Sequence, residues 1–244
     1  MKKIFAIILL LGFWTNLMAQ EDTLDFETKI DNMGVFYELV MDFPIINTDA
    51  LNEQLSNFEF PQANYRTTNF GFGLQLHISR AIISFAFCKG TKTDEQTNYV
   101  TQVEYRSTSL NVGYDLLKNT HFSLYPYIGF KGCGLNYLYK DIIPDEAFFS
   151  QYFGTNLQYK EISNSRGHLD LGIGFSHQWF YLINFRAGYL LPLEKVQWTI
   201  NNGKTALSKS PTIDYQYYFS LRIGLGYIEG NRKKRHTENE TYNL

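Results

Sequence analysis

Two histidines lie two residues before a serine, a spacing that could support nucleophilic chemistry. His77 precedes Ser79, and His121 precedes Ser123. Residues i and i+2 of an extended strand face the same side, so either pair could form the Ser–His couple of a lipid hydrolase. Both pairs lie close to short turns, however, and no acidic residue is placed to orient either imidazole. We therefore expect no catalytic residue in this chain.

The two cysteines, Cys88 and Cys133, are expected to be free thiols. They fall on predicted strands that are separated by one intervening strand, which is beyond the reach of a disulfide. No group of Cys or His residues has the spacing of metal ligands. Glycine pairs such as Gly71 and Gly73 lie inside strand patterns and do not match the phosphate-binding motif that opens a helix. The sequence thus predicts neither a metal site nor a cofactor.

Polar side chains of one parity would line the interior of a barrel formed by the predicted strands. An eight-stranded interior is just wide enough to be filled by side chains, and charges placed there must pair or meet water. We interpret the set as a structural network of salt bridges and hydrogen bonds, with a narrow solute or ion path as the alternative. The predicted network comprises Glu38, Gln75, His77, Asp115, Lys131, Asp170, Arg186 and Arg222.

The elements that must position these residues are strands, because apolar and polar residues alternate along most of the chain. Phe70, Phe72 and Leu74, for example, alternate with Gly71 and Gly73. The pattern predicts eight strands, at about residues 35–42, 69–78, 81–88, 98–115, 121–139, 169–176, 181–189 and 215–227.

The connections between these strands alternate between short and long. The short ones lie near residues 79–80, 118–120 and 178–180, and the long ones near 44–68, 90–97, 140–165 and 192–212. In an up-and-down barrel this order places all long loops at one end, which is the asymmetry of outer-membrane barrels. The sequence therefore predicts an all-β fold, an eight-stranded antiparallel up-and-down transmembrane β-barrel with long extracellular loops.

Two local features interrupt the pattern. Gly132 and Gly134 follow Lys131 with the parity of the apolar residues, which predicts a β-bulge nearby. In the first long connection, Thr48 is placed to cap a short helix over residues 49–57.

Aromatic residues gather near both ends of the predicted strands, as in the two interfacial girdles of membrane barrels. The band near the short turns comprises Tyr114, Phe122, Tyr125, Trp179, Tyr181 and Tyr227. The band near the long loops comprises Tyr99, Tyr137, Tyr139, Tyr189, Tyr215 and Tyr217.

The N-terminus has the composition of a secretory signal. Lys2 and Lys3 precede an apolar run over residues 4–14, and cleavage is predicted near Ala19. The predicted organisation is a signal peptide over residues 1–19, a barrel domain over 20–228 and a polar periplasmic tail over 229–244.

The composition excludes several classes of protein. With 44% hydrophobic and 19% charged residues, the chain is too apolar to be disordered. Its formal charge of −2 lacks the excess of positive charge that is typical of nucleic-acid-binding proteins. Beyond the N-terminal run, no stretch approaches the roughly 18 apolar residues of a transmembrane helix, so a membrane-embedded form must cross with strands that close into a barrel.

The patterns over residues 69–74 and 219–227 resemble those of small outer-membrane β-barrel proteins of the OmpA-barrel and OmpX type. The chain looks closest to the Bacteroidetes outer-membrane β-barrel domain group, over about residues 33–227. The resemblance implies a monomeric, porin-like protein of the outer membrane without enzymatic activity, with a structural or surface-interaction role through its long loops. The partners it implies are outer-membrane lipid and surface or periplasmic proteins, not nucleic acid. The alternatives are an outer-membrane lipid hydrolase, a narrow solute pore and a component of secretion or motility machinery.

Overall fold

The computed structural model describes residues 33–117, 121–142, 158–178, 181–195, 197–200, 205–207 and 211–228. The signal peptide predicted over residues 1–19 and the tail predicted over 229–244 lie outside these residues, so both boundaries stay predictions. Among the described residues, no helix is long and apolar enough to cross a membrane.

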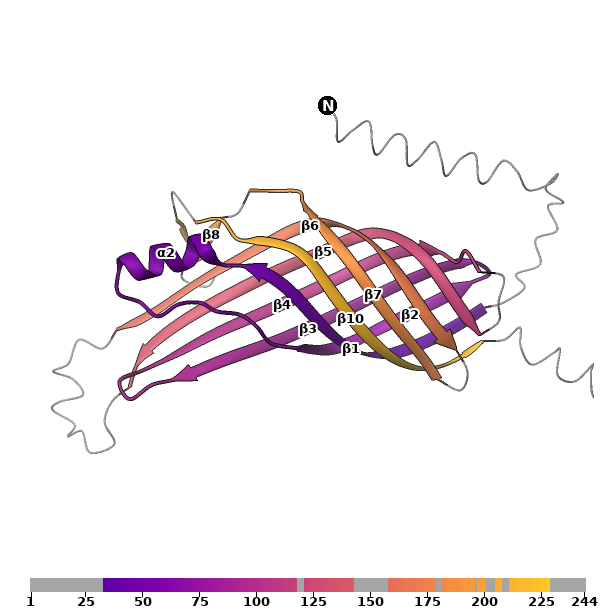
Figure 1. Cartoon of the computed structure of the whole chain (residues 1–244), viewed down its shortest axis with the longest axis horizontal. Helices are drawn as coiled ribbons and strands as arrows, with labels where there is room; N and C mark the ends of the chain where they lie inside the picture. The colour runs from indigo at the N-terminus through magenta and orange to yellow at the C-terminus, as the bar shows by residue number, and fades with distance from the viewer. Residues whose placement is uncertain are drawn as a thin grey trace, which may run out of the picture. The chain divides into compact units, whose positions relative to one another are not determined.

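Eight antiparallel strands close into a barrel (Figure 1). Each strand pairs with its neighbours in chain order, and pairing between the first and the last of them completes the ring. The predicted eight-stranded antiparallel up-and-down β-barrel is thus confirmed. The barrel strands are β1 (Met33–Asn47), β2 (Asn69–Ile78), β3 (Ala81–Glu95), β4 (Tyr99–Tyr114), β5 (Phe122–Asp141), β6 (Tyr159–Gln178), β7 (Tyr181–Pro192) and β10 (Asp214–Ile228).

Several strands are longer than the alternation predicted. β3 continues to Glu95 and β4 begins at Tyr99, so a tight connection replaces the long loop predicted near residues 90–97. Two short strands, β8 (Trp198–Ile200) and β9 (Thr205–Ala206), lie between β7 and β10, and β8 pairs with β6. The strands β3 to β6 therefore extend beyond the part of the barrel that the other strands enclose (Figure 1).

The first long connection contains the predicted helix, α2 (Asp49–Asn57). Contrary to the prediction, Thr48 does not cap it with its side chain; instead the Asn47 side-chain oxygen accepts a hydrogen bond from the Asp49 backbone amide at 2.8 Å. Leu51 and Leu55, one turn apart, are the buried residues of the helix. Their side chains pack into the hydrophobic core at the long-loop end, which also contains Trp198 of β8.

The polarity of the inner and outer faces reverses from one end of the barrel to the other. Toward the short turns, polar side chains such as Glu38 and Gln75 point inward while Leu39 and Phe72 point outward. Toward the long loops, the interior is instead a hydrophobic core that includes Leu51 and the inward-facing residues of β4 and β5. The members of this core include Val103, Tyr105, Cys133, Leu135, Tyr137, Trp198, Ile213 and Tyr215.

The reversal occurs on β5 at Gly132, and the predicted bulge there is wrong. Pairing of β5 with β4 and β6 runs through this point without a shift of register. Phe130 points outward with 61% of its surface exposed, whereas inward-facing Lys131 is 3% exposed and inward-facing Leu135 is 1% exposed. The parity is therefore constant, and what changes is the environment on each side of the strand.

A bulge does occur in β10, where the sequence pattern did not indicate one. Ile45 pairs with Tyr217 and Ile46 pairs with Tyr215, so Gln216 has no counterpart on β1. An extra residue reverses the facing of all residues on one side of it. As a result Tyr215 is buried and Gln216 is exposed, the reverse of the prediction that placed them on the lipid-facing and inner sides.

The two predicted aromatic bands are correct only in part. Tyr125 and Tyr137 are buried inside the barrel, as is Tyr215, whereas the bands required outward-facing rings. Outward-facing members of the bands are Phe122, Tyr181, Tyr189, Tyr217 and Tyr227. Trp179 lies outside the described residues.

Candidate functional site

The interior toward the short turns holds most of the predicted polar network. Seven of the eight predicted residues are buried there, and they come from six strands. They are Glu38, Gln75, His77, Lys131, Asp170, Arg186 and Arg222.

Asp115 is the exception, and its inclusion was wrong. It follows the end of β4 and lies in the turn toward β5. Its Oδ1 accepts hydrogen bonds from the backbone amides of Leu117, at 3.0 Å, and Leu124, at 3.1 Å. The carboxylate thus satisfies turn amides, a common role for Asp where a strand ends.

Two buried ion pairs lie in the interior, one across it from β5 to β1 and one between the neighbouring strands β10 and β1. Lys131 Nζ lies 2.8 Å from Asp42 Oδ2, and Arg222 Nη1 lies 3.2 Å from Glu38 Oε2. The ammonium group of Lys131 also lies 3.3 Å from the centroid of the Tyr218 ring. Such pairing is what makes a buried charge tolerable. Asp42 shares the parity of Glu38 on β1, which is the signal by which it could have been added to the predicted network.

Arg186 has neutral partners in place of a carboxylate. Its terminal nitrogens donate to Ser84 Oγ and Gln75 Oε1, both at 2.6 Å. Gln75 Oε1 also accepts from Asn184 Nδ2 at 2.8 Å. The guanidinium carbon lies 5.5 Å from the ring centroids of Tyr125 and of Tyr127, within the range of cation–π attraction.

Asp170 is held by neutral donors. Its Oδ2 accepts hydrogen bonds from Asn111 Nδ2 at 2.6 Å and from the Tyr218 hydroxyl at 2.7 Å. The Tyr218 hydroxyl lies 2.9 Å from that of Tyr127. Tyr218 shares the inward parity of Arg222 on β10, which is the signal by which it could have been added to the predicted network.

Inward-facing glycines make room for these tyrosines. A Cβ atom at Gly174 would overlap the ring of Tyr125, and one at Gly172 would overlap the phenol of Tyr127. This explains why the glycines alternate with apolar residues on β6. The interior can therefore hold large hydrogen-bonding rings, and it is filled by side chains.

Neither predicted Ser–His pair forms a couple. His77 is buried beside Gln75, with 2.6 Å between Nε2 of each, while Ser79 lies in the β2–β3 turn with a φ of 53°. That backbone conformation ends the strand geometry that would have put both side chains on one face. Ser123 Oγ accepts a hydrogen bond from Gln178 Nε2 at 3.4 Å, and the Nδ1 of His121 lies 3.4 Å from the Gln178 carbonyl.

The cysteines are buried free thiols, as expected. Both face inward at the level of Ser107, which pairs with Cys88 on one side and with Cys133 on the other. Within the part of the chain that the structure describes, no three His, Cys, Asp or Glu side chains are grouped so as to hold a metal ion.

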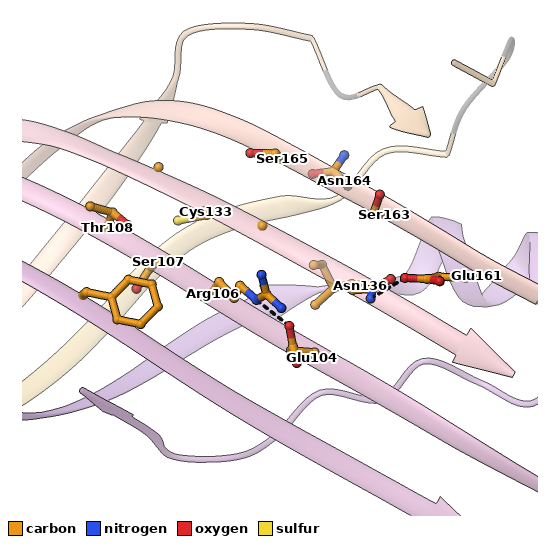
Figure 2. A pocket seen from close by; sticks show the side chains of 14 residues that line it. Glu104, Arg106, Ser107, Thr108, Cys133, Asn136, Glu161, Ser163, Asn164 and Ser165 are labelled. Carbon is orange, nitrogen blue, oxygen red and sulfur yellow. Dashed lines mark hydrogen bonds and ion pairs between the residues drawn. The ribbon is translucent and has the colours of Figure 1, made fainter. Parts of the chain in front are cut away.

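A groove of about 490 Å³ lies on the outer face of β4, β5 and β6, and no sequence pattern indicated it. Its floor is formed at Gly132 and Gly134, which have no side chains to fill it, and Figure 2 shows the polar residues around it. Its lining comprises Phe87, Glu104, Arg106, Ser107, Thr108, Gly132, Cys133, Gly134, Leu135, Asn136, Glu161, Ser163, Asn164 and Ser165.

Ion pairs and hydrogen bonds order one end of the groove. Glu104 contacts Lys89 Nζ at 2.8 Å and Arg106 Nε at 2.5 Å, and Asn136 Nδ2 donates to Glu161 at 3.0 Å (Figure 2). Burial raises the pKa of the Glu104 carboxyl, but the hydrogen bonds from Lys89 and Arg106 outweigh it, so the pKa lies below its ordinary value. Glu104 is therefore ionised at neutral pH.

The class of protein that this fold defines is the small, closed, eight-stranded antiparallel β-barrel, here with an interior that is polar toward the short turns and apolar toward the long loops. No protein-family model matches the sequence, and no curated protein matches it either.

Several solved structures are similar in fold. A major outer membrane protein from Thermus thermophilus has 11% identity and a TM-score of 0.47, over 80% of this chain and 99% of that one. Ail, the attachment invasion locus protein of Yersinia pestis, has 11% identity and a TM-score of 0.39, over 81% and 97%. The N-terminal β-barrel domain of Pseudomonas aeruginosa OprF has 11% identity and a TM-score of 0.37, over 80% and 97%. At such identities and scores the fold assignment rests on the strand pairing of this chain itself.

Proposed function

We propose that the chain is a non-enzymatic outer-membrane β-barrel protein that acts structurally or through contacts made at its long-loop end. The observation that carries the proposal is the reversal of polarity at the level of Gly132: apolar side chains face outward toward the short turns and inward toward the long loops. A barrel surrounded by water would keep an apolar interior and a polar exterior along its whole length. A membrane-spanning barrel has the opposite arrangement where it meets lipid.

The apolar outer surface supports the membrane placement. Outward-facing Leu39, Phe72, Phe85, Phe130 and Phe219 are between 47% and 71% exposed, and they come from five different strands. Exposed apolar surface of this extent mostly marks a place where a protein meets a partner or a membrane. Because the residues encircle a closed barrel, lipid is the partner that fits them.

The closed ring of strands favours a monomer. Between the short turns and the level of Lys89, every strand is paired on both sides, so no edge is open to a second copy. Contacts with surface partners are then left to the long-loop end, whose outer face carries Lys89, Arg106 and Glu161.

Spin labels on the outer face of β5 test the proposal. In the protein reconstituted in lipid vesicles, a label at Phe130→Cys should be relaxed by oxygen, and one at Asn136→Cys by a polar nickel chelate. The parent chain serves as the labelling control, because its two cysteines are buried. Labels that both lie in water, or protein recovered in the soluble periplasmic fraction, would contradict membrane insertion.

Of the alternatives, hydrolysis of outer-membrane lipid has the least support, because Gln75 and Gln178 engage the residues that would form the Ser–His couples. It predicts an altered lipid composition after deletion of the gene, which lipid mass spectrometry would detect. A role in secretion or motility machinery predicts protein partners that co-purify after mild detergent extraction.

A further inference from the structure

The outer groove lies at the level where the outward surface changes from apolar to polar. Phe130 and Leu110, two positions closer to the short turns than Gly132 and its partner Thr108, are 61% and 52% exposed. On the other side of the groove, Asn136 and Glu161 are hydrogen-bonded to each other. A molecule held in the groove would therefore contact an apolar surface below and water above.

Hydrogen-bonding groups stand on both sides of the glycine floor. Thr108 on β4 pairs with Gly132, and Ser165 on β6 pairs with Gly134; both hydroxyl-bearing side chains are exposed. Arg106 pairs with Gly134 from β4. Arg106 and Ser165 thus flank the same residue, Gly134, from opposite sides. Hydrogen-bond donors and acceptors therefore lie on both sides of the glycines that form the groove floor (Figure 2).

The charges at the groove balance. Lys89 and Arg106 both form ion pairs with Glu104, and the Glu161 carboxylate accepts a hydrogen bond from Asn136, so two cations and two anions lie at the groove. A phosphate-rich ligand would meet the two carboxylates and be repelled. Uncharged hydroxyl groups, by contrast, can donate to the carboxylates and accept from the guanidinium.

We propose that this groove binds the neutral sugar headgroup of a glycolipid in the outer leaflet. The inference rests on the proposed membrane placement, because it lays the acyl chains of the lipid over Phe130 and Leu110. The groove volume of about 490 Å³ lies within the range of small-molecule sites. The boundary position selects a membrane-anchored sugar over a free one.

Two side chains have distinct roles in this site. The Arg106 side chain is 61% exposed and pairs with Glu104 through Nε. Among the described residues, its two terminal nitrogens have no hydrogen-bond or ion-pair partner, so they are the donors left for sugar oxygens. Phe87, 43% exposed on β3, supplies an apolar ring against which the C–H face of a sugar can pack.

Native mass spectrometry of the full chain in detergent micelles tests the proposal. The probes are digalactosyl diacylglycerol, phosphatidylglycerol and the free digalactose. The chain should retain the glycolipid in preference to the phospholipid and should not retain the free sugar. Gly132→Trp, which fills the groove, and Arg106→Ala, which removes a charged donor, should each weaken glycolipid retention by about tenfold.

Matched variants separate this result from general damage. Ala187→Trp adds the same large ring to the outer face of β7, away from the groove, and should bind as the parent does. Gly132→Ala adds only a methyl group, whose nearest neighbouring atom is the Thr108 carbonyl oxygen at 3.9 Å, so it should fold normally and weaken retention less than Gly132→Trp does. Equal retention by Gly132→Trp and the parent, equal retention of both lipids, or retention of the free sugar would each overturn the proposal. The spin-label depths on β5 report membrane insertion separately, so failure of the site can be told from failure of the membrane placement.

Discussion

Lys131 and Asp42 show how a charge is kept inside the barrel. Their side chains are 4% and 3% exposed, and the ammonium and carboxylate lie 2.8 Å apart. Removing one partner of such a pair leaves the other charge buried and uncompensated, which is the expensive outcome. Removing both leaves no uncompensated charge.

A double-mutant cycle should therefore be strongly non-additive at this pair. Lys131→Met should lower the free energy of unfolding by about 3–5 kcal/mol, whereas Lys131→Met combined with Asp42→Leu should recover most of that loss. Urea unfolding of the protein in lipid vesicles measures both values. Additive losses would mean that the two side chains do not depend on each other in the folded barrel.

Glu104 gives a prediction about pH at the outer groove. Its folded-state pKa lies below the ordinary value of 4.5, because the hydrogen bonds from Lys89 and Arg106 outweigh the effect of burial. A lowered pKa stabilises the folded state above the ordinary value, and this contribution is lost as the pH falls through the lowered pKa. An NMR titration of the carboxyl carbon should thus show a midpoint below 4.5.

The arginine and lysine variants supply the control for this titration. In Arg106→Ala and in Lys89→Ala the midpoint should move upward, because each substitution removes one hydrogen bond to the charged form. A midpoint in the parent chain at or above 4.5 would show that burial dominates at Glu104.

At the scale of single elements, α2 is held to the barrel by its apolar side chains. Leu51 and Leu55 pack into the core at the long-loop end, and the Tyr137 hydroxyl donates to the Pro61 carbonyl oxygen at 2.8 Å. A helix of this length has little stability of its own in water. The first connection therefore stays folded only while these contacts hold.

Leu51→Ala together with Leu55→Ala should release the first connection while the barrel remains intact. Each truncation of a buried leucine costs about 2–5 kcal/mol. Hydrogen exchange should accelerate at the Asn52 and Phe60 amides, which bond within this connection, and stay slow in β1 and β2. Glu53→Ala, on the exposed side of the helix, is the matched control and should leave exchange unchanged. Faster exchange throughout the barrel would contradict a separable loop.

Strand number, order and most inward positions followed from the sequence, because a period of two fixes which residues share a face. The bulge at Gln216 could not be predicted, since residues 217–219 are aromatic on both parities and only the pairing with β1 reveals the extra residue. The bulge predicted at Gly132 failed for a related reason. An alternation pattern records the parity of a residue but not whether lipid, water or a core lies on that side. The outer groove could not be predicted because residues from four strands line it and glycines form its floor.

At the scale of the whole chain, the mean hydropathy of −0.26 averages two opposite arrangements. Toward the short turns the apolar residues face outward, and toward the long loops they face inward. Neither a soluble barrel nor a purely lipid-embedded one would distribute its residues in this way. The composition alone therefore does not reveal the membrane placement that the distribution supports.

Conductance is the property of the whole barrel that distinguishes a filled interior from a pore. The ion pair of Lys131 and the hydrogen bonds of Arg186 cross the interior, and the ion pair of Arg222 lies within it. The core around Leu51 lies between these groups and the long-loop end. An eight-stranded barrel filled in this way leaves no continuous path for ions. The folded protein in a planar lipid bilayer should therefore show no stepwise current, and Leu51→Ala with Leu55→Ala should show none either, because the polar network still blocks the interior. Stepwise current in the parent chain would favour the narrow pore. Current that appears only in the double leucine variant would show that the first connection, and not the polar network, blocks the passage of ions.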